Sequence, residues 1–251
     1  MSQDSARPQA PRRKGPRGPL EMIVNAVCSF VGCIVVAVVL GTLLEVAGAY
    51  SFWKAESLAG PGHAFNHLSS DFKYVQVFPR SILVPDTQAF TSRLLSVARW
   101  PYDKCGITKM VVKARALRAG EVSPNPRSPS LLLMMSQHIA QALEILVYVT
   151  QDVAVRLAMA LFALPVLVLA ILIGVVDGLV QRDVRKWSGG RESSFIYHHA
   201  KHYAKWFMTA GFSIYLGWPL SGFNPTYLLL AFAALTAFAL AITCASFKKY
   251  L

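Results

Sequence analysis

The chain has 251 residues, of which 54% are hydrophobic and 15% are charged, and its formal net charge is +12. A soluble globular protein carries roughly a quarter charged residues, and a disordered chain has low hydrophobicity, so the composition excludes both classes. The apolar residues gather in runs of about 20, the length that spans a bilayer as a helix. The basic excess must therefore be interpreted by position, because membrane topology produces basic segments without nucleic-acid contact.

The N-terminal region combines a polar tail with a long apolar run. Residues 1–19 are rich in Pro, Arg and Gly, so we expect a disordered basic tail. The run that follows predicts a first transmembrane helix over 20–49. Its end, Ala47-Gly-Ala49, is similar to a signal-peptide cleavage site, but the apolar stretch exceeds the roughly 7–15 residues of a signal peptide. We expect the helix to be retained as an anchor.

Residues 50–155 predict an α-rich domain outside the membrane, since the segment is too long to be a mere connector. Residues 60–80 mix Gly, Pro, His and Ser and are expected to be irregular. Asp86 then predicts the N-cap of an amphipathic helix, and residues 107–119 predict a short basic helix.

The end of this domain, residues 130–156, predicts an amphipathic helix. One helical face would carry polar side chains at spacings of three and four, namely Gln137, Gln141, Glu144, Tyr148 and Asp152. The opposite face would be apolar, with Ile139, Leu143, Leu146 and Val153. We do not expect this helix to cross the membrane, because its polar residues would be costly in lipid. Its apolar face either packs on the outer domain, or lies on the membrane or docks a partner helix.

The remaining apolar runs complete a layout of four spans. The second transmembrane helix is predicted over 156–180, with Pro165 as a source of a kink. Residues 206–251 predict a hairpin of two helices, with its turn at Asn224-Pro225. The last helix presents small side chains on one face, which permit close approach of another helix within the bundle or from a second copy: Ala234, Ala237, Ala241 and Ala245.

Basic residues set the expected orientation. Five Lys and Arg residues lie in 1–19, six in 182–205 and two in 248–251. With four spans these three segments share one side, and the positive-inside rule makes that side the cytoplasm. Both termini would then be cytoplasmic. Because topology accounts for the basic excess, we do not expect direct contact with nucleic acid.

The predicted cytoplasmic basic loop, residues 181–205, carries two notable runs. They are Arg182-Asp-Val-Arg-Lys-Trp187 and Gly189-Gly-Arg-Glu-Ser-Ser-Phe-Ile-Tyr-His198. With the four-span layout over about residues 20–250, these runs resemble a family of inner-membrane proteins with a domain of unknown function. Such proteins are encoded on integrating conjugative elements, near the gene for the type IV coupling protein. The resemblance supplies no catalytic residues.

The resemblance implies an accessory subunit of a conjugative type IV secretion system in a bacterial inner membrane, with residues 50–155 in the periplasm. Its expected partners are the coupling protein or other secretion-channel subunits, besides the lipid bilayer. Arg and aromatic side chains often dominate interface energies, so we expect docking residues in this loop: Arg182, Asp183, Arg185, Lys186, Trp187, Arg191, Glu192, Tyr197 and His198.

Catalytic chemistry finds little support in the sequence. There is no G-x-x-x-x-G-K-[ST], no G-x-S-x-G and no C-x-x-C, the patterns of phosphate binding, hydrolase and redox sites. His198 and His202 would share a helical face, but one such pair offers too few ligands for a catalytic metal. We expect no enzyme, metal or cofactor. Two alternatives stay open: an entry-exclusion or mating-pair factor acting through the periplasmic domain, and a metal-dependent membrane enzyme using His198 and His202.

Overall fold

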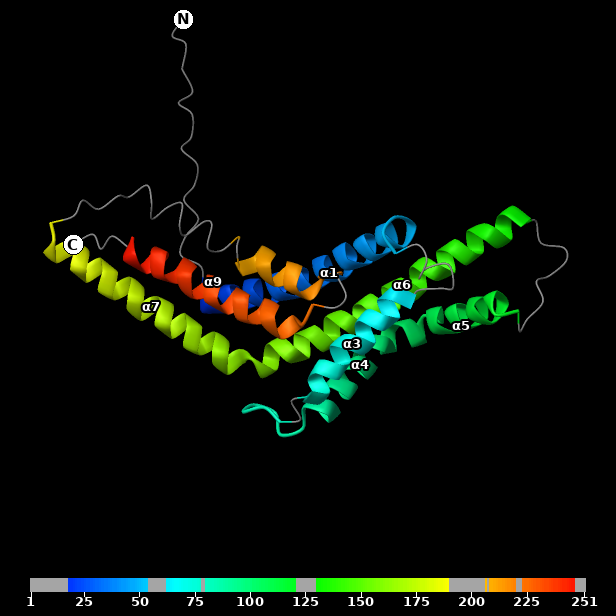
Figure 1. The fold of residues 1–251 in the computed structure, drawn as a ribbon, viewed down its shortest axis with the longest axis horizontal. Coiled ribbons are helices and arrows are strands. Elements are labelled where there is room, and N and C mark those ends of the chain that lie inside the picture. Colours follow the sequence, from blue (N-terminus) through cyan, green and yellow to red (C-terminus); the bar gives the residue numbers. More distant parts are fainter. Residues whose placement is uncertain are drawn as a thin grey trace, which may run out of the picture. The chain divides into compact units, whose positions relative to one another are not determined.

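The described part of the protein is all-helical. The computed structural model describes residues 18–53, 62–77, 80–120, 130–189, 206, 208–219 and 223–246, and every regular element in these ranges is a helix (Figure 1). This confirms the expected all-α fold class. Two compact units divide the chain at Gly32 and Cys33, and all the packing described below lies within the second unit.

Helix α1 (Pro19–Tyr50) is a single apolar helix of 32 residues, about 48 Å long at 1.5 Å per residue. Its first half is exposed and rich in Val, Ile and Leu, as expected for a surface in lipid. From Cys33 onward one face becomes buried at every fourth residue: Cys33, Ala37, Gly41, Glu45 and Ala49. This stripe of mostly small residues lies in the second unit and is the face on which the other helices of that unit pack.

Three helices pack on a fourth to form the outer bundle: α3 (Gly62–Val77), α4 (Thr87–Lys104) and α5 (Ile107–Arg118) on α6 (Ser130–Phe162). The capping prediction is confirmed, because the Asp86 carboxylate accepts a hydrogen bond of 2.9 Å from the Ala89 amide. The short basic helix is confirmed as α5. The prediction of an irregular segment over 60–80 is wrong for residues 62–77, because tertiary packing stabilises α3 despite weak local propensity.

The predicted second span, 156–180, contains a helix boundary. Helix α6 ends at Phe162 and α7 (Leu164–Trp187) begins one residue later, with Pro165 in its first turn. Proline has no N–H and its ring clashes with the carbonyl four residues earlier, so it interrupts the helix. Bonds of 3.0 Å from the Ala163 amide to Met159 and from the Leu167 amide to Ala163 continue across the break. The chain therefore bends at Ala163 without reversing (Figure 1).

Helices α7 and α9 (Pro225–Ala245) pack side by side and run parallel. Gly174 of α7 lies against Ala237, and Gly178 lies against Ala241. Farther along, Arg185 Nη1 donates to the Ala245 carbonyl at 3.2 Å. Residue numbers rise together in both helices, which defines the parallel direction. Of the small residues predicted on one face of this last helix, Ala241 and Ala245 are buried within the chain and Ala234 is exposed.

The helical segment 208–216 supplies the return between these parallel helices. It runs beside α1 in the same direction, since Thr209 contacts Cys33 and Gly217 lies against Ala37. The Asn224-Pro225 turn is confirmed, with the Asn224 side chain capping α9 by accepting a 2.9 Å bond from the Thr226 amide. Between the parallel helices α7 and α9 the chain must run back once, and this segment lies in that stretch of the sequence.

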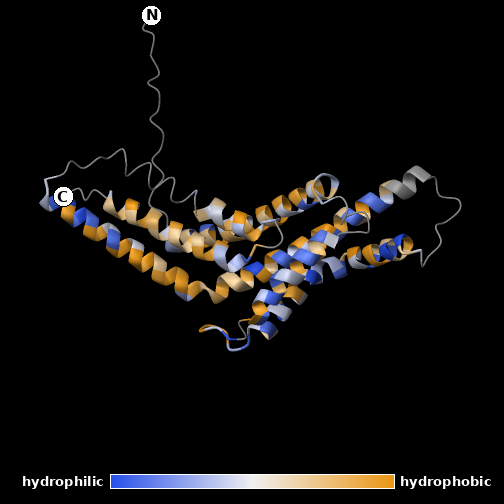
Figure 2. Cartoon of the chain, viewed as in Figure 1, coloured by the Kyte–Doolittle hydropathy of each residue, from blue (hydrophilic) through white to orange (hydrophobic). Residues whose placement is uncertain are grey.

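Four described helices are long and apolar enough to cross a membrane: α1, residues 135–162 of α6, α7 and α9. Helix α6 differs from the others, because 56% of its most apolar stretch is buried in the protein, against 6% in α1 and 11% in α7. Figure 2 shows long hydrophobic stretches along α1, α7 and α9, whereas α3 to α5 are mixed. The apolar residues of α6 are therefore explained by packing inside the protein as well as by contact with a membrane.

Candidate functional site

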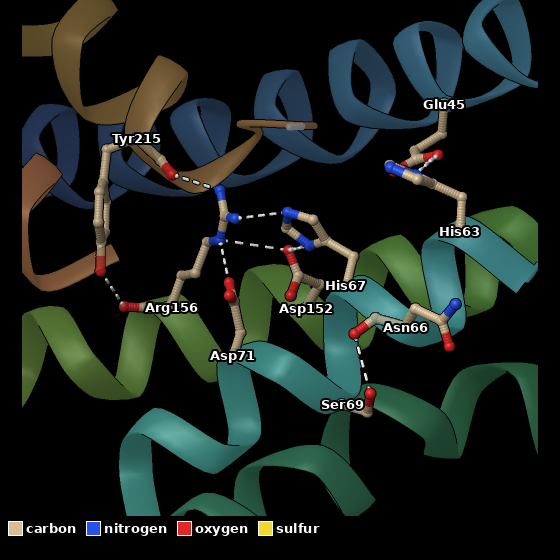
Figure 3. Close-up of polar contacts among 9 residues, drawn as sticks. All are labelled: Glu45, His63, Asn66, His67, Ser69, Asp71, Asp152, Arg156 and Tyr215. Atoms are coloured by element: carbon tan, nitrogen blue, oxygen red, sulfur yellow. Dashed lines mark hydrogen bonds and ion pairs between the residues drawn. The ribbon is translucent and has the colours of Figure 1, made fainter. Parts of the chain in front are cut away.

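A fully buried arginine organises the polar centre of the second unit (Figure 3). The Arg156 side chain on α6 has 0% exposure. Its Nε lies 2.7 Å from Asp71 Oδ2 and 3.2 Å from Asp152 Oδ2. Its Nη2 lies 3.1 Å from His67 Nε2, and its Nη1 donates to the Tyr215 carbonyl at 3.0 Å. We call Arg156, Asp71, Asp152, His67 and Tyr215 the Arg156 network.

The network joins three segments that are distant in sequence. Asp71 and His67 come from α3, Arg156 and Asp152 from α6, and Tyr215 from segment 208–216. The Tyr215 hydroxyl donates to the Arg156 carbonyl at 3.1 Å, which returns the bond that Arg156 makes to the Tyr215 carbonyl. The last carbonyls of a helix lack intrahelical partners, so Arg156 also satisfies the end of this segment.

The pKa values of His67 and Asp71 are both raised within the network. Burial by itself would lower the pKa of His67, but the hydrogen bond and charge of Asp152, whose Oδ2 lies 3.3 Å from His67 Nδ1, raise it above its usual value. Burial and the neighbouring Asp152 raise the pKa of Asp71 to about 6, against the opposing effect of Arg156. The single positive charge of Arg156 therefore does not fully offset the repulsion between the two carboxylates and the burial of Asp71.

A second histidine–carboxylate pair extends the polar centre to α1. His63 Nδ1 lies 3.0 Å from both carboxylate oxygens of Glu45, and both side chains are buried. The Trp53 ring stacks on His63 with centroids 4.1 Å apart and an interplanar angle of 11°. Glu45, His67 and Asp152 line one small cavity, and the rings of His63 and His67 lie 6.3 Å apart, so this pair adjoins the Arg156 network. The buried contact between His63 and Glu45 thus joins α3 to helix α1.

The donor atoms of His67, Asp71 and Asp152 lie within 4.8 Å of one another, a spacing that can hold a metal ion. However, the guanidinium of Arg156 lies among them and donates to Asp71, while also neutralising Asp152. A cation would have to displace this buried positive charge, which is costly. The arrangement fits an ion-pair network better than a metal centre.

On the predicted polar face of residues 130–156, Glu144 and Asp152 are buried, whereas Gln137 is exposed. Glu144 is buried and pairs with Arg115 and, at 2.6 Å, with Arg118 of α5. Asp152 on the same face belongs to the Arg156 network. The sequence had left the packing of the apolar face open, and in the structure Val153 is buried whereas Ile139 is exposed. Ion pairs to α3 and α5, rather than apolar contacts alone, therefore hold α6 in the outer bundle.

The predicted docking residues fall into two groups. Five of them lie on the last turns of α7: Arg182, Asp183, Arg185, Lys186 and Trp187. Trp187 is 92% exposed, whereas Arg185 is engaged with the end of α9. The others lie outside the described residues: Arg191, Glu192, Tyr197 and His198, together with His202 of the metal alternative.

The Arg156 network was not predicted, although its pattern is present in the sequence. His63, His67 and Asp71 recur at intervals of four, as do Asp152 and Arg156, so each set lies on one face of a helix. Assigning residues 60–80 to an irregular segment concealed the first set. Arg156 stood at the edge of a predicted span and received no role.

We expect Asp71 to make stability fall as pH rises from about 4 to about 6. The folded state keeps the Asp71 proton up to a pKa of about 6, whereas the usual value is 3.8, so folding binds a proton in this interval. His67, with its pKa raised above 6.5, is protonated in both states over this interval and adds a fall in stability only as pH rises above about 6.5. Thermal unfolding in detergent across this range should show a less negative slope for Asp71→Asn than for the wild type, by at most about 1.4 kcal/mol per pH unit. The exposed Asp103→Asn is the control, and equal slopes for Asp71→Asn and wild type would contradict the assignment.

These features define a multi-pass helical membrane protein whose helices are joined by buried ion pairs. The chain belongs to the DtrJ-like family, described as IncC plasmid conjugative DNA transfer protein DtrJ-like, whose family model matches residues 52–248. No curated protein and no solved structure matches the chain. The resemblance to membrane proteins of conjugative elements is confirmed, and the chain is a protein of conjugative DNA transfer.

Proposed function

We propose that this chain is a non-enzymatic inner-membrane subunit of the conjugative type IV secretion apparatus and a partner of the coupling protein. The observation that carries the proposal is an exposed basic and aromatic surface at the end of α7, in a chain of a conjugative transfer family. Trp187 is 92% exposed there, beside Lys186. Arg and Trp side chains are among the commonest hot spots of interfaces, and Trp187 is the most exposed Trp of the described residues.

The non-enzymatic role is supported by the chemistry of the buried polar groups. Within the described residues the largest cluster of titratable side chains is the Arg156 network, and its charges are mutually paired. A catalytic site usually holds groups that are free to exchange protons with a substrate in a cleft. The Arg156 network instead joins α3, α6 and segment 208–216, which is a structural task.

The proposed topology follows from the directions of the helices. Parallel α7 and α9 both end on one side, and the intervening segment 208–216 runs the opposite way. The loop after α7 and the C-terminus then share that side. Because both regions are basic, the positive-inside rule supports a cytoplasmic location for them and a periplasmic location for α3 to α5. Helix α6, with its ion-paired face, belongs to the periplasmic bundle in this layout.

Native Cys105 tests this topology. It is exposed between α4 and α5, so we expect a membrane-impermeant maleimide to label it in intact spheroplasts. In the double variant Cys105→Ala/Lys186→Cys, labelling of the new cysteine should require permeabilised cells. If α6 and α7 were consecutive spans, α7 would end in the periplasm, and Lys186→Cys would react in intact spheroplasts.

The docking surface is tested by the double variant Lys186→Glu/Trp187→Ala. Loss of one hot-spot side chain costs about 2 kcal/mol or more, which is roughly a thirtyfold loss of affinity. We expect the variant to insert normally but to lose co-purification with the coupling protein in mild detergent, with a matching fall in mating frequency. The control is Phe52→Ala, which removes an exposed aromatic side chain just after the C-terminal end of α1. Normal co-purification and transfer by the double variant would refute the docking role.

A further inference from the structure

A large apolar groove lies between α1, α4 and α6. It encloses about 420 Å³, and its walls include Ile34 and Val38 of α1, Leu94 and Pro101 of α4, and Val153 and Leu157 of α6. Its volume is in the range of small-molecule sites, about 300–1,000 Å³. None of the functions proposed above uses it.

The groove offers its occupant no free hydroxyl proton, because the hydroxyl groups on its wall already donate elsewhere. Thr150 donates to the Leu146 carbonyl at 2.8 Å, and the Tyr102 hydroxyl lies 2.7 Å from Thr150 Oγ1. Since the Thr150 proton is already used, Tyr102 donates to Thr150. An apolar ligand therefore suits this groove, whereas a ligand with many hydrogen-bond acceptors would lose the bonds that it makes to water.

The groove is continuous with the lipid-facing surface. Ile34 and Val38 belong to the apolar run of α1, and their neighbours Val35 and Val39 are exposed apolar residues of the same helix. Apolar surface of a membrane-spanning helix contacts acyl chains. The groove thus draws one of its walls from the helix that borders the hydrocarbon.

One border of the groove is basic and aromatic. The side chains of α4 that line the groove form a stripe that includes Leu94 and Pro101, and Cys105 continues it just after the helix. By helical spacing Arg93 and Lys104 lie beside this stripe, and both are exposed, as is Trp100, which is 61% exposed. Trp and basic side chains together are typical of contacts with lipid headgroups at the membrane interface.

We propose that this groove binds one acyl chain of a bilayer glycerophospholipid, with the lipid phosphate beside Arg93 and Lys104. A second helix fits less well, because a helix 10–12 Å across fills roughly 400–600 Å³ in a single turn. About 420 Å³ would accept at most about one turn, whereas a narrow acyl chain can extend along the groove. The bound lipid would fasten α4 to α1 at the membrane surface.

Photocrosslinking tests the site directly. The full chain is reconstituted in vesicles of phosphatidylethanolamine and phosphatidylglycerol that contain a trace of phosphatidylglycerol with a diazirine near the middle of one acyl chain. After illumination and digestion, mass spectrometry should find lipid adducts on α4 between Leu94 and Cys105, besides those on α1, α7 and α9. Adducts on the last three helices alone would overturn the proposal, as would crosslinks from this stretch to a second copy of the chain.

Two matched variants on α4 sharpen the result. Ala98→Phe places a ring in the groove, since Ala98 lines it, and should lower the α4 adducts by about tenfold, the equivalent of 1.4 kcal/mol. Ser96→Phe adds the same ring on an exposed position outside the groove and should leave them unchanged. Arg93→Glu/Lys104→Glu should lower the adducts without blocking the groove. Equal adducts in Ala98→Phe and Ser96→Phe would contradict the proposal, and the wild-type result stands even if one variant fails to fold.

Discussion

Replacing Arg156 by Met is expected to lower the free energy of unfolding by about 3–5 kcal/mol, the usual cost of removing one partner from a buried ion pair. Arg156 is completely buried between Asp71 and Asp152, and its removal leaves these carboxylates facing each other with only His67 nearby. It also leaves the Tyr215 carbonyl without its donor. Thermal unfolding of purified protein in detergent, its level in membranes and the mating frequency should all fall together.

Two controls separate electrostatics from packing. Arg99→Met removes an arginine whose partner Asp103 lies 3.5 Å away with half of each side chain exposed, so it should cost no more than about 1 kcal/mol. Adding Asp71→Asn and Asp152→Asn to Arg156→Met removes the uncompensated charges, and we expect this triple variant to recover part of the lost stability. A triple variant less stable than Arg156→Met alone would mean that the network acts through shape and not through charge balance.

Gly174→Leu is expected to separate α7 from α9 and to abolish transfer. A Cβ atom at Gly174 would lie 2.4 Å from the Ala237 backbone oxygen, a distance that neither helix can relieve without moving. Overpacking of this kind costs about 1–3 kcal/mol, and here it also disturbs the close approach on which membrane helices depend for association. The expected readouts are a lower unfolding temperature in detergent and reduced accumulation in the membrane.

Gly32→Leu is the matched control for this effect. Gly32 also lies within an apolar helix, but nothing lies within 4 Å of a Cβ placed there, so the same substitution should leave stability and transfer unchanged. An equal loss in both variants would show that the defect comes from adding a leucine to an apolar helix and not from the contact between α7 and α9.

Several local features could be predicted because they depend on neighbours in sequence. Asp86 and Asn224 cap helices through bonds to amides two or three residues away. Pro165 marks a helix break because its effect reaches only four residues back. Long apolar runs predict α1, α7 and α9, and runs of this kind need no tertiary partner to be recognised.

The polar centre could not be predicted in the same way, because its contacts join distant residues. Arg156 is 85 residues from Asp71 and 59 from Tyr215. Each half of the network has a visible period of four, but only the packing of α3 on α6 makes the halves meet. Likewise, Glu144 was predicted on a polar face, and the basic helix that neutralises it, α5, was predicted separately without a link between them.

The pattern of residues was enough to predict a helical membrane protein, and the motif of the loop after α7 led to conjugative transfer. Apolar length, caps and basic segments are local properties, and each has a direct physical consequence for a single helix. The tertiary structure decided which faces meet: parallel α7 and α9 through Gly174 and Gly178, a buried Arg156 shared by three segments, and an apolar groove beside α1. These contacts depend on the close approach of helices that are distant in sequence. The effect of a glycine or of a buried charge is therefore set by the residue that lies opposite it.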